Sequence, residues 1–130
     1  MEIRKIRSFE DLEVYKLARE FRKRIYNLTR KLPKEEKYNL FSQMRRAAVS
    51  LTNNIAEGYG RYHFKENIQF CRESRGSLYE LIDDLNTCID ESYVSEDEYN
   101  NYRKEAFRLL KILNSYIAKT REMQSEYLEK

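Results

Sequence analysis

The residue types that most often carry chemistry are scarce in this chain, which has one histidine and two cysteines among its 130 residues. His63 stands three positions before Glu66, whereas helical bundles that hold paired metal ions use the opposite order, Glu-x-x-His, twice. The sequence also contains no glycine-rich phosphate-binding loop and no recognisable nucleophile motif. We therefore predict no catalytic residues, no metal site and no cofactor, and we expect that the protein is not an enzyme.

A strip of polar residues lies inside the segment RRAAVSLTNNIAEGYGR, residues 45–61. Its members recur at spacings of four, four and three, as residues on one side of a helix do. They are Arg46, Ser50, Asn54 and Glu57. Glycine in a helix interior is less favourable than alanine by about 1 kcal/mol, so Gly76 in the later segment RGSLYE suggests a close approach of two helices.

This polar strip has two interpretations, and the sequence leaves both open. It can be a structural network that locks two neighbouring helices together, because buried polar groups need hydrogen-bond partners. It can also extend to a subunit contact or to a ligand surface. The residues assigned to the network are Ser50, Asn54, Glu57, Gly76, Ser77 and Glu80.

The formal net charge of +3 conceals an uneven distribution of charge along the chain. Residues 1–46 carry 14 basic and 7 acidic residues, and residues 47–95 carry 4 basic and 8 acidic ones. At helical spacing the basic residues Lys16, Arg19, Lys23 and Arg30 form one stripe, and Glu66, Glu73, Glu80, Asp84 and Glu91 form an acidic one. Such stripes can be solvated helix surfaces, can bind nucleic acid, or can pair between subunits.

The elements that must position these residues are helices. Three glycines and one proline in the whole chain are too few for the many turns of a sheet protein. Apolar residues recur at helical spacing in four segments, at about 9–32, 34–58, 64–91 and 95–127. Short connections make successive long helices antiparallel, so we predict an all-α, up-down-up-down antiparallel four-helix bundle that forms a single domain over residues 1–130.

Local signals set the expected ends of these helices. Ser8 with Asp11, and Ser95 with Glu98, have the spacing of a capping box at a helix start. Leu32-Pro33 is expected to end the first helix, and the GYGR segment, residues 58–61, to end the second. Cys71 and Cys88 fall on one helix about 25 Å apart, so we expect unpaired core cysteines.

The N-terminal segment lacks the apolar region of a signal peptide, and no run of the sequence approaches about 18 apolar residues. We therefore expect a cytoplasmic protein with no membrane partner.

Two central motifs resemble a known family. FSQMRRAAVSLTNNIAEGYGR and FCRESRGSLYEL, together with the N-terminal FEDLEVYKLA, are similar to the bacterial 23S rRNA intervening-sequence proteins. The resemblance covers almost the whole chain. It implies an up-down bundle that assembles as a homopentamer, encoded in some cases within large-subunit ribosomal RNA genes. A related group, the accessory proteins of diversity-generating retroelements, binds a reverse transcriptase and nucleic acid.

From these observations we predict a non-catalytic, oligomeric helical bundle that binds the backbone of RNA or DNA. The residues predicted to bind phosphate are Arg19, Lys23, Arg45, Arg46 and Arg61. Arginine suits this role because its planar guanidinium donates two hydrogen bonds at once. The alternative is a protein-interaction scaffold or an accessory subunit, for example of a reverse transcriptase, whose charged faces make subunit contacts.

Overall fold

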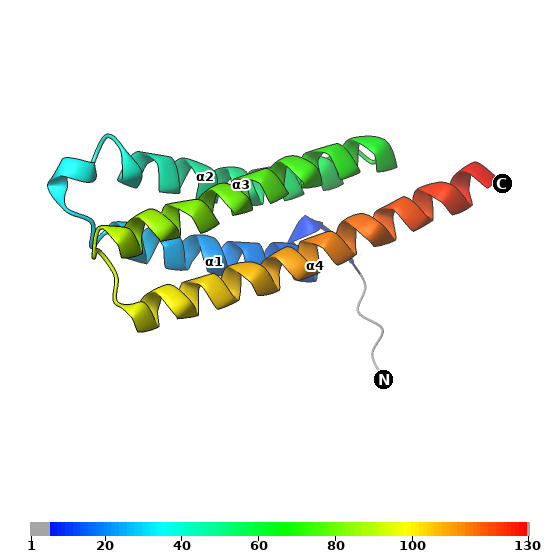
Figure 1. Ribbon diagram of the computed structural model, residues 1–130. Coiled ribbons are helices and arrows are strands. Elements are labelled where there is room, and N and C mark those ends of the chain that lie inside the picture. Colours follow the sequence, from blue (N-terminus) through cyan, green and yellow to red (C-terminus); the bar gives the residue numbers. More distant parts are fainter. Residues whose placement is uncertain (1–5, 130) are drawn as a thin grey trace.

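The computed structural model describes residues 6–129, and the predicted features at residues 1–5 and 130 lie outside that range. Within it the chain forms four α-helices (Figure 1): α1 (Glu13–Thr29), α2 (Leu40–Gly60), α3 (Phe64–Asp90) and α4 (Glu96–Glu129). Two short 3-10 turns, η1 (Phe9–Asp11) and η2 (Lys34–Glu36), precede α1 and α2. The described residues include no strand, and the predicted all-α fold is confirmed.

Side-chain contacts between neighbouring helices show that each pair is antiparallel. In every pair the residue numbers rise along one helix as they fall along the other. The contacts are Arg22–Thr52 and Arg45–Thr29 for α1 and α2, Ser74–Leu51 and Ser77–Ser50 for α2 and α3, Asn67–Tyr116 and Asn86–Tyr99 for α3 and α4, and Arg24–Glu105 and Lys31–Glu98 for α1 and α4. The helices therefore run up, down, up and down around one core.

The core is made by the apolar stripe that each helix contributes. Phe21, Ile25, Leu51, Leu81 and Leu113 are completely buried, and all five belong to stripes that the sequence predicts. Removing such a side chain from water contributes about 1.5–3 kcal/mol, so packing along these stripes dominates the stability of the bundle. Cys71 and Cys88 are free and buried in the same core, as predicted.

The first helix begins later and ends earlier than the predicted range of 9–32. Ser8 and Asp11 do form a capping box, but it caps the 3-10 turn η1 rather than a long helix. Leu12 is extended, with φ −69° and ψ 132°, and this residue separates η1 from α1. At the other end α1 stops at Thr29, whose hydroxyl donates to the carbonyl of Tyr26.

The second helix is shifted along the chain relative to the predicted range of 34–58. Residues 34–39 form η2 and a turn, and α2 begins at Leu40. It continues through Gly58 to Gly60, and the chain then reverses at Tyr62, which has a positive φ of 59°. The left-handed position is thus taken by a tyrosine, and Gly58 lies inside the helix, where glycine serves a different purpose.

Gly58, and not Gly76, marks the close approach of two helices. A Cβ atom at position 58 would lie 3.0 Å from the Cβ of Phe70 and 3.1 Å from the carbonyl oxygen of Asn67, both on α3. A Cβ atom at position 76 would meet no atom within 4 Å. The predicted close approach at Gly76 is therefore wrong, because this glycine lies on the exposed side of α3.

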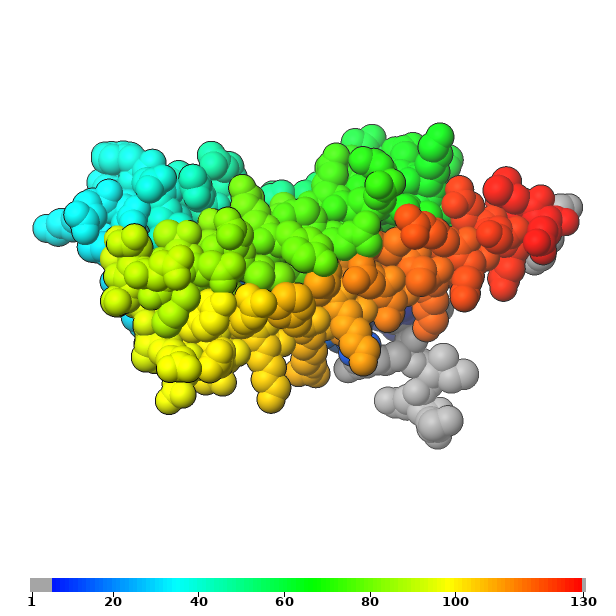
Figure 2. Space-filling model, in the orientation of Figure 1, coloured from blue at the N-terminus to red at the C-terminus, as the bar shows by residue number. Residues whose placement is uncertain are grey.

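The last two helices match the predicted ranges to within two residues. α3 ends at Asp90, and Ser92 carries the positive φ of 61° in the turn that follows. The predicted capping box at the start of α4 is present, since Ser95 and Glu98 exchange side-chain-to-backbone hydrogen bonds of 3.1 Å. The C-terminal turns of α4 extend beyond the other three helices (Figures 1 and 2). No helix within residues 6–129 combines the length and the apolar character that crossing a membrane requires.

Candidate nucleic-acid interface

A row of basic side chains runs along the outward side of α1, opposite its buried stripe. We call this set the α1 row; it consists of Lys16, Arg19, Lys23 and Arg30, all exposed. Among residues 6–129, the one ion pair that the row forms is that of Lys23, whose Nζ lies 3.5 Å from Glu20. Both side chains of that pair are more than 60% exposed, and such surface pairs contribute little, so the charge of Lys23 stays available to a partner.

A second row of cations, which was not predicted from the sequence, lies on the outward side of α4. The α4 row consists of Lys104, Arg108, Lys111 and Lys119, which are exposed and span an arc of about 80° at ~100° per residue. None of the four forms an ion pair with another residue of the described chain. Figure 2 shows long side chains projecting from α4 along the lower edge of the molecule.

The signal for the α4 row is present in the sequence but is hidden by the total charge of the C-terminal third. Between residues 99 and 121 there are six basic residues and one acidic residue. The other acidic residues of α4 lie in its first turn and after Arg121, so residues 96–130 sum to a formal charge of zero. Counting charges by helix face would have found the row.

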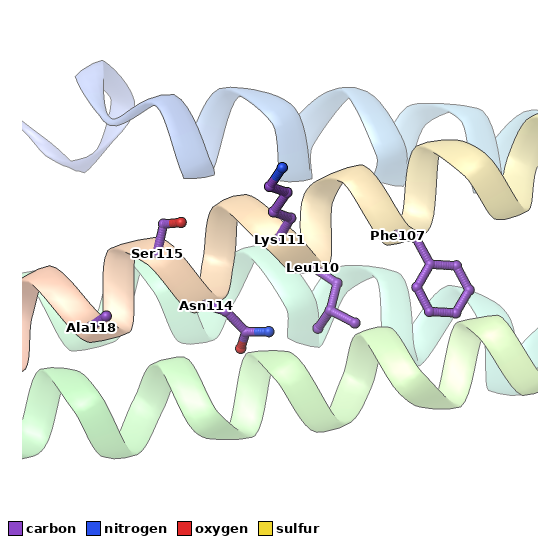
Figure 3. A pocket seen from close by; sticks show the side chains of 6 residues that line it. All are labelled: Phe107, Leu110, Lys111, Asn114, Ser115 and Ala118. Carbon is purple, nitrogen blue, oxygen red and sulfur yellow. The ribbon is translucent and has the colours of Figure 1, made fainter.

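The two rows belong to the neighbouring helices α1 and α4, and we call these eight residues together the basic face. Ion pairs of Arg24 with Glu105 and of Lys31 with Glu98 hold α1 beside α4, in antiparallel order. In a close view of α4, the side chain of Lys111 extends toward α1, whereas Phe107 points toward the α3 side (Figure 3). Each row lies on the side of its helix opposite the buried stripe, so the side chains of both rows point away from the core.

Arg45, one of the predicted phosphate-binding residues, is engaged within the bundle. Its guanidinium carbon lies 4.2 Å from the ring centre of Tyr26 and 4.3 Å from that of Phe41. Its Nε donates a 2.9 Å hydrogen bond to the hydroxyl of Thr29. This arrangement braces the start of α2 against the end of α1, and it leaves Arg45 only partly exposed.

Arg61 directly follows α2, and Arg46 lies in the first half of that helix. Arg61 donates to Glu57 at 2.8 Å and approaches Glu66 at 3.8 Å, so it joins the end of α2 to the start of α3. Arg46 is exposed, about 22 Å away along the helix at ~1.5 Å per residue. The five predicted residues therefore do not form one cluster, and only Arg19 and Lys23 belong to the basic face.

Part of the predicted polar network joins α2 to α3. Asn54 donates to the carbonyl and to the hydroxyl of Ser50, each at 2.9 Å, and Ser77 donates to the same hydroxyl at 2.9 Å. The buried Ser74 adds a 2.7 Å bond to the carbonyl of Leu51, which the sequence analysis did not include. These bonds lock the two helices at mid-length.

Glu57, Gly76 and Glu80 do not take part in this network. Glu57 is exposed and pairs with Arg61 on its own helix. Glu80 is exposed and forms no hydrogen bond to another residue within 6–129. Both carboxylates point to solvent, so the inter-helix brace is shorter than predicted.

The acidic stripe on α3 gives that helix the opposite sign from the basic face. Glu66, Glu73, Glu80 and Glu91 are exposed, whereas Asp84 is only 6% exposed. The Oδ2 atom of Asp84 has no hydrogen-bond partner among the described residues. Burial, followed by the charges of Glu80 and Asp83, raises the pKa of Asp84 to about 6.

A half-open groove of about 940 Å³ lies at the end of the bundle where α1 and α3 begin. Its walls are mainly apolar and include Leu12, Tyr59, Phe64, Tyr116 and Met123, with His63 among the lining residues. A shallower groove of about 460 Å³ follows α4 from Phe107 to Ala118 (Figure 3). Within residues 6–129, no three histidine, cysteine or acidic side chains lie close enough together to hold a metal ion.

Comparison with known proteins gives one family and one fold. The model of the 23S rRNA-intervening sequence protein family matches residues 10–115. A crystal structure of a protein of unknown function from the S23 ribosomal protein family of Bacteroides thetaiotaomicron superimposes with a TM-score of 0.74. It is 24% identical, and the match covers 81% of this chain and 95% of that one, which shows a shared fold. No curated protein matches the chain.

Proposed function

The chain belongs to the 23S rRNA-intervening sequence protein family, and from this premise we propose that it is a non-catalytic bundle that binds the backbone of RNA or DNA. The observation that supports this proposal is the basic face, in which the α1 row and the α4 row lie on neighbouring helices. Phosphate contacts by lysine and arginine supply most of the affinity of sequence-independent nucleic-acid binding.

The state of these side chains suits them to bind phosphate. The cations of the α4 row are exposed and make no ion pair within the described chain, so binding would not first require an internal contact to break. The carboxylates beside these rows include Glu105, which is paired with Arg24, Glu98, which is paired with Lys31, and Glu20, which faces Lys23. The surface therefore keeps a large excess of positive charge.

The proposal changes the set of residues that we expect to bind. Arg19 and Lys23 stay in the set because they point outward on α1. Arg45 and Arg61 already make contacts inside the bundle, and we expect them to contribute more to stability than to binding. The residues of the α4 row join the set.

Neutralising three of the four cations of the α4 row is expected to weaken binding of a labelled RNA or DNA duplex by roughly 10–100-fold, because three phosphate contacts and their released counterions are lost. The variant is Lys104→Gln/Arg108→Gln/Lys111→Gln, measured by fluorescence anisotropy at about 0.1 M salt. A matched control, Lys37→Gln/Lys65→Gln/Arg72→Gln, removes the same charge from exposed positions outside the basic face. Equal losses of affinity in the two variants would show only an effect of net charge and would contradict the proposed interface.

A second candidate function is self-assembly through the charged faces, and the acidic stripe on α3 favours it. One copy can place the acidic α3 against the basic face of the next, and such a head-to-tail contact closes into a ring when the rotation permits. The resemblance to the family implies five copies. Light scattering tests this directly: a ring is expected to have several times the 15.9 kDa mass of the chain, and a monomer at all concentrations would refute it.

A further inference from the structure

A phenylalanine ring is exposed among the cations of the α4 row. Phe107 is 41% exposed, and it lies three residues after Lys104 and four residues before Lys111. Residues at these spacings are neighbours on one side of a helix, so a lysine flanks the ring in the turn before it and another in the turn after it. The α4 row therefore offers an apolar surface as well as positive charge.

Phe107 also forms one end of the shallow groove of about 460 Å³ that follows α4. The lining residues that point toward α3 are Phe107, Leu110 and Asn114, and those that point toward α1 are Lys111 and Ser115 (Figure 3). Leu110 is only 7% exposed, so it gives the groove an apolar floor. A flat group bound here would contact the ring on one side and lie beside the ammonium group of Lys111 on the other.

Contacts from outside the groove hold its polar and aromatic groups in place. The guanidinium carbon of Arg103, one turn before Phe107, lies 5.0 Å from the ring centre, and Nη1 of Arg103 donates to the hydroxyl of Tyr99 at 3.2 Å. The Oδ1 atom of Asn114 accepts a 2.9 Å hydrogen bond from Arg75 on α3. Because these side chains are already ordered, a ligand would lose less free energy in fixing them.

A nucleotide with an unpaired base has the chemistry that this groove would recognise. Its base can stack on an aromatic ring, and its phosphate can pair with the neighbouring lysines. In a duplex each base is already stacked between its neighbours and is not free to contact a protein ring. A duplex can therefore use the cations of the α4 row, whereas a single strand can use both the cations and the ring.

The exposed ring on α3 lacks such an excess of cations. Tyr79 is 52% exposed, but Glu80 follows it directly and Asp83 lies one turn later, both of them exposed. Arg75, one turn before Tyr79, already donates to Asn114. Carboxylates repel phosphate, so a strand that stacked on Tyr79 would meet unfavourable charge. Tyr79 is therefore a matched control, an equally accessible ring in acidic surroundings.

We propose that the groove beside Phe107 binds an unpaired base of single-stranded RNA or DNA, while Lys104 and Lys111 bind the adjacent phosphates. This inference rests on the proposed function, because it names the class of nucleic acid that gains an additional contact at the α4 row. The added contact does not read sequence, since every base has a face on which it can stack.

The first test changes the ligand and leaves the protein intact. A labelled thymidine strand of about 12 nucleotides is compared with an abasic deoxyribose strand of the same length and charge, each titrated with the full chain in fluorescence anisotropy at about 0.1 M salt. We expect the thymidine strand to bind about five- to tenfold more tightly. Equal affinities overturn the stacking contact and leave the proposed function standing. Binding of neither strand and of no duplex overturns both.

The second test changes the ring. Phe107→Leu keeps an apolar side chain but removes the face for stacking, so it is expected to lower the affinity for the thymidine strand about five- to tenfold, to the level of the abasic strand. The affinity for a DNA duplex should stay within about twofold, and Phe107→Trp should bind the thymidine strand at least as tightly as the wild type does. The control Tyr79→Leu should change neither affinity by more than about twofold.

Two outcomes of the second test would overturn the inference. An equal loss of affinity for the abasic strand and for the duplex in Phe107→Leu would mean that the ring supports the surface and does not stack on a base. A lower mass of Phe107→Leu in light scattering, together with weaker binding of every ligand, would mean that the ring packs against a second copy of the chain.

Discussion

Alanine at position 58 is expected to destabilise the protein by about 1–3 kcal/mol, although alanine is intrinsically the better helix former. The added Cβ would lie 2.8 Å from Oδ1 of Asn67, 3.0 Å from the Cβ of Phe70 and 3.1 Å from the carbonyl oxygen of Asn67. The amide of Asn67 could turn away only by giving up its 3.1 Å hydrogen bond to the hydroxyl of Tyr116. The other two atoms move only if α3 itself shifts away from α2.

The matched control is Gly76→Ala, for which we expect the opposite sign. Position 76 is in the interior of α3 with open space around it, so alanine should stabilise the protein by up to about 1 kcal/mol through helix propensity alone. Urea unfolding followed by circular dichroism measures both variants. A loss of stability in both, or in neither, would contradict the assignment of the helix contact to Gly58.

Asp84 is expected to make the protein less stable at about pH 8 than its core packing alone would allow. The folded-state pKa of Asp84, about 6, lies above the ordinary value of 3.8, so the native state holds the proton more tightly than the unfolded chain does. The penalty for the buried charge is therefore fully present above the folded pKa and is relieved as the pH falls from above 6 to below 4. A shift of about two units corresponds to no more than about 3 kcal/mol.

The variant Asp84→Asn removes this penalty because asparagine stays neutral. We expect it to be more stable than the wild type by about 1–2 kcal/mol near pH 8, with an advantage that shrinks as the pH approaches 5. This gain in stability is smaller than the roughly 3 kcal/mol that the full pKa shift represents, because a buried amide group also needs hydrogen-bond partners. The control Asp83→Asn changes an exposed neighbour and should stay within about 0.5 kcal/mol at both pH values. A stability difference between Asp84→Asn and the wild type that does not depend on pH would refute a buried, titrating carboxyl.

The helices and their core could be predicted because helical periodicity is a property of the sequence itself. The stripes that contain Phe21, Leu51 and Leu113 are buried as predicted, and the Ser95–Glu98 box caps α4. The break between η1 and α1 at Leu12 could not be predicted, because it depends on how the chain packs and not on any breaking residue. Spacing alone also could not decide which of two glycines meets a neighbouring helix.

The candidate site was less predictable than the fold. Sequence shows that Arg45 is basic but does not show that its guanidinium lies between Tyr26 and Phe41. The α4 row was predictable in principle, since its spacing is visible, but summing charge over the whole segment concealed it. Whether a charged side chain is free to bind a ligand depends on its neighbours in space, and those neighbours come from other helices.

The salt dependence of duplex binding by the wild-type chain tests the central claim most directly. If the basic face binds phosphates through six to eight cations, a plot of log affinity against log salt concentration should be a straight line with a slope of roughly −5 to −7. Binding should be measurable at about 0.05 M salt and should fall steeply by about 0.2 M. A slope near zero, or no binding to any duplex at the lower salt concentration, would contradict the account.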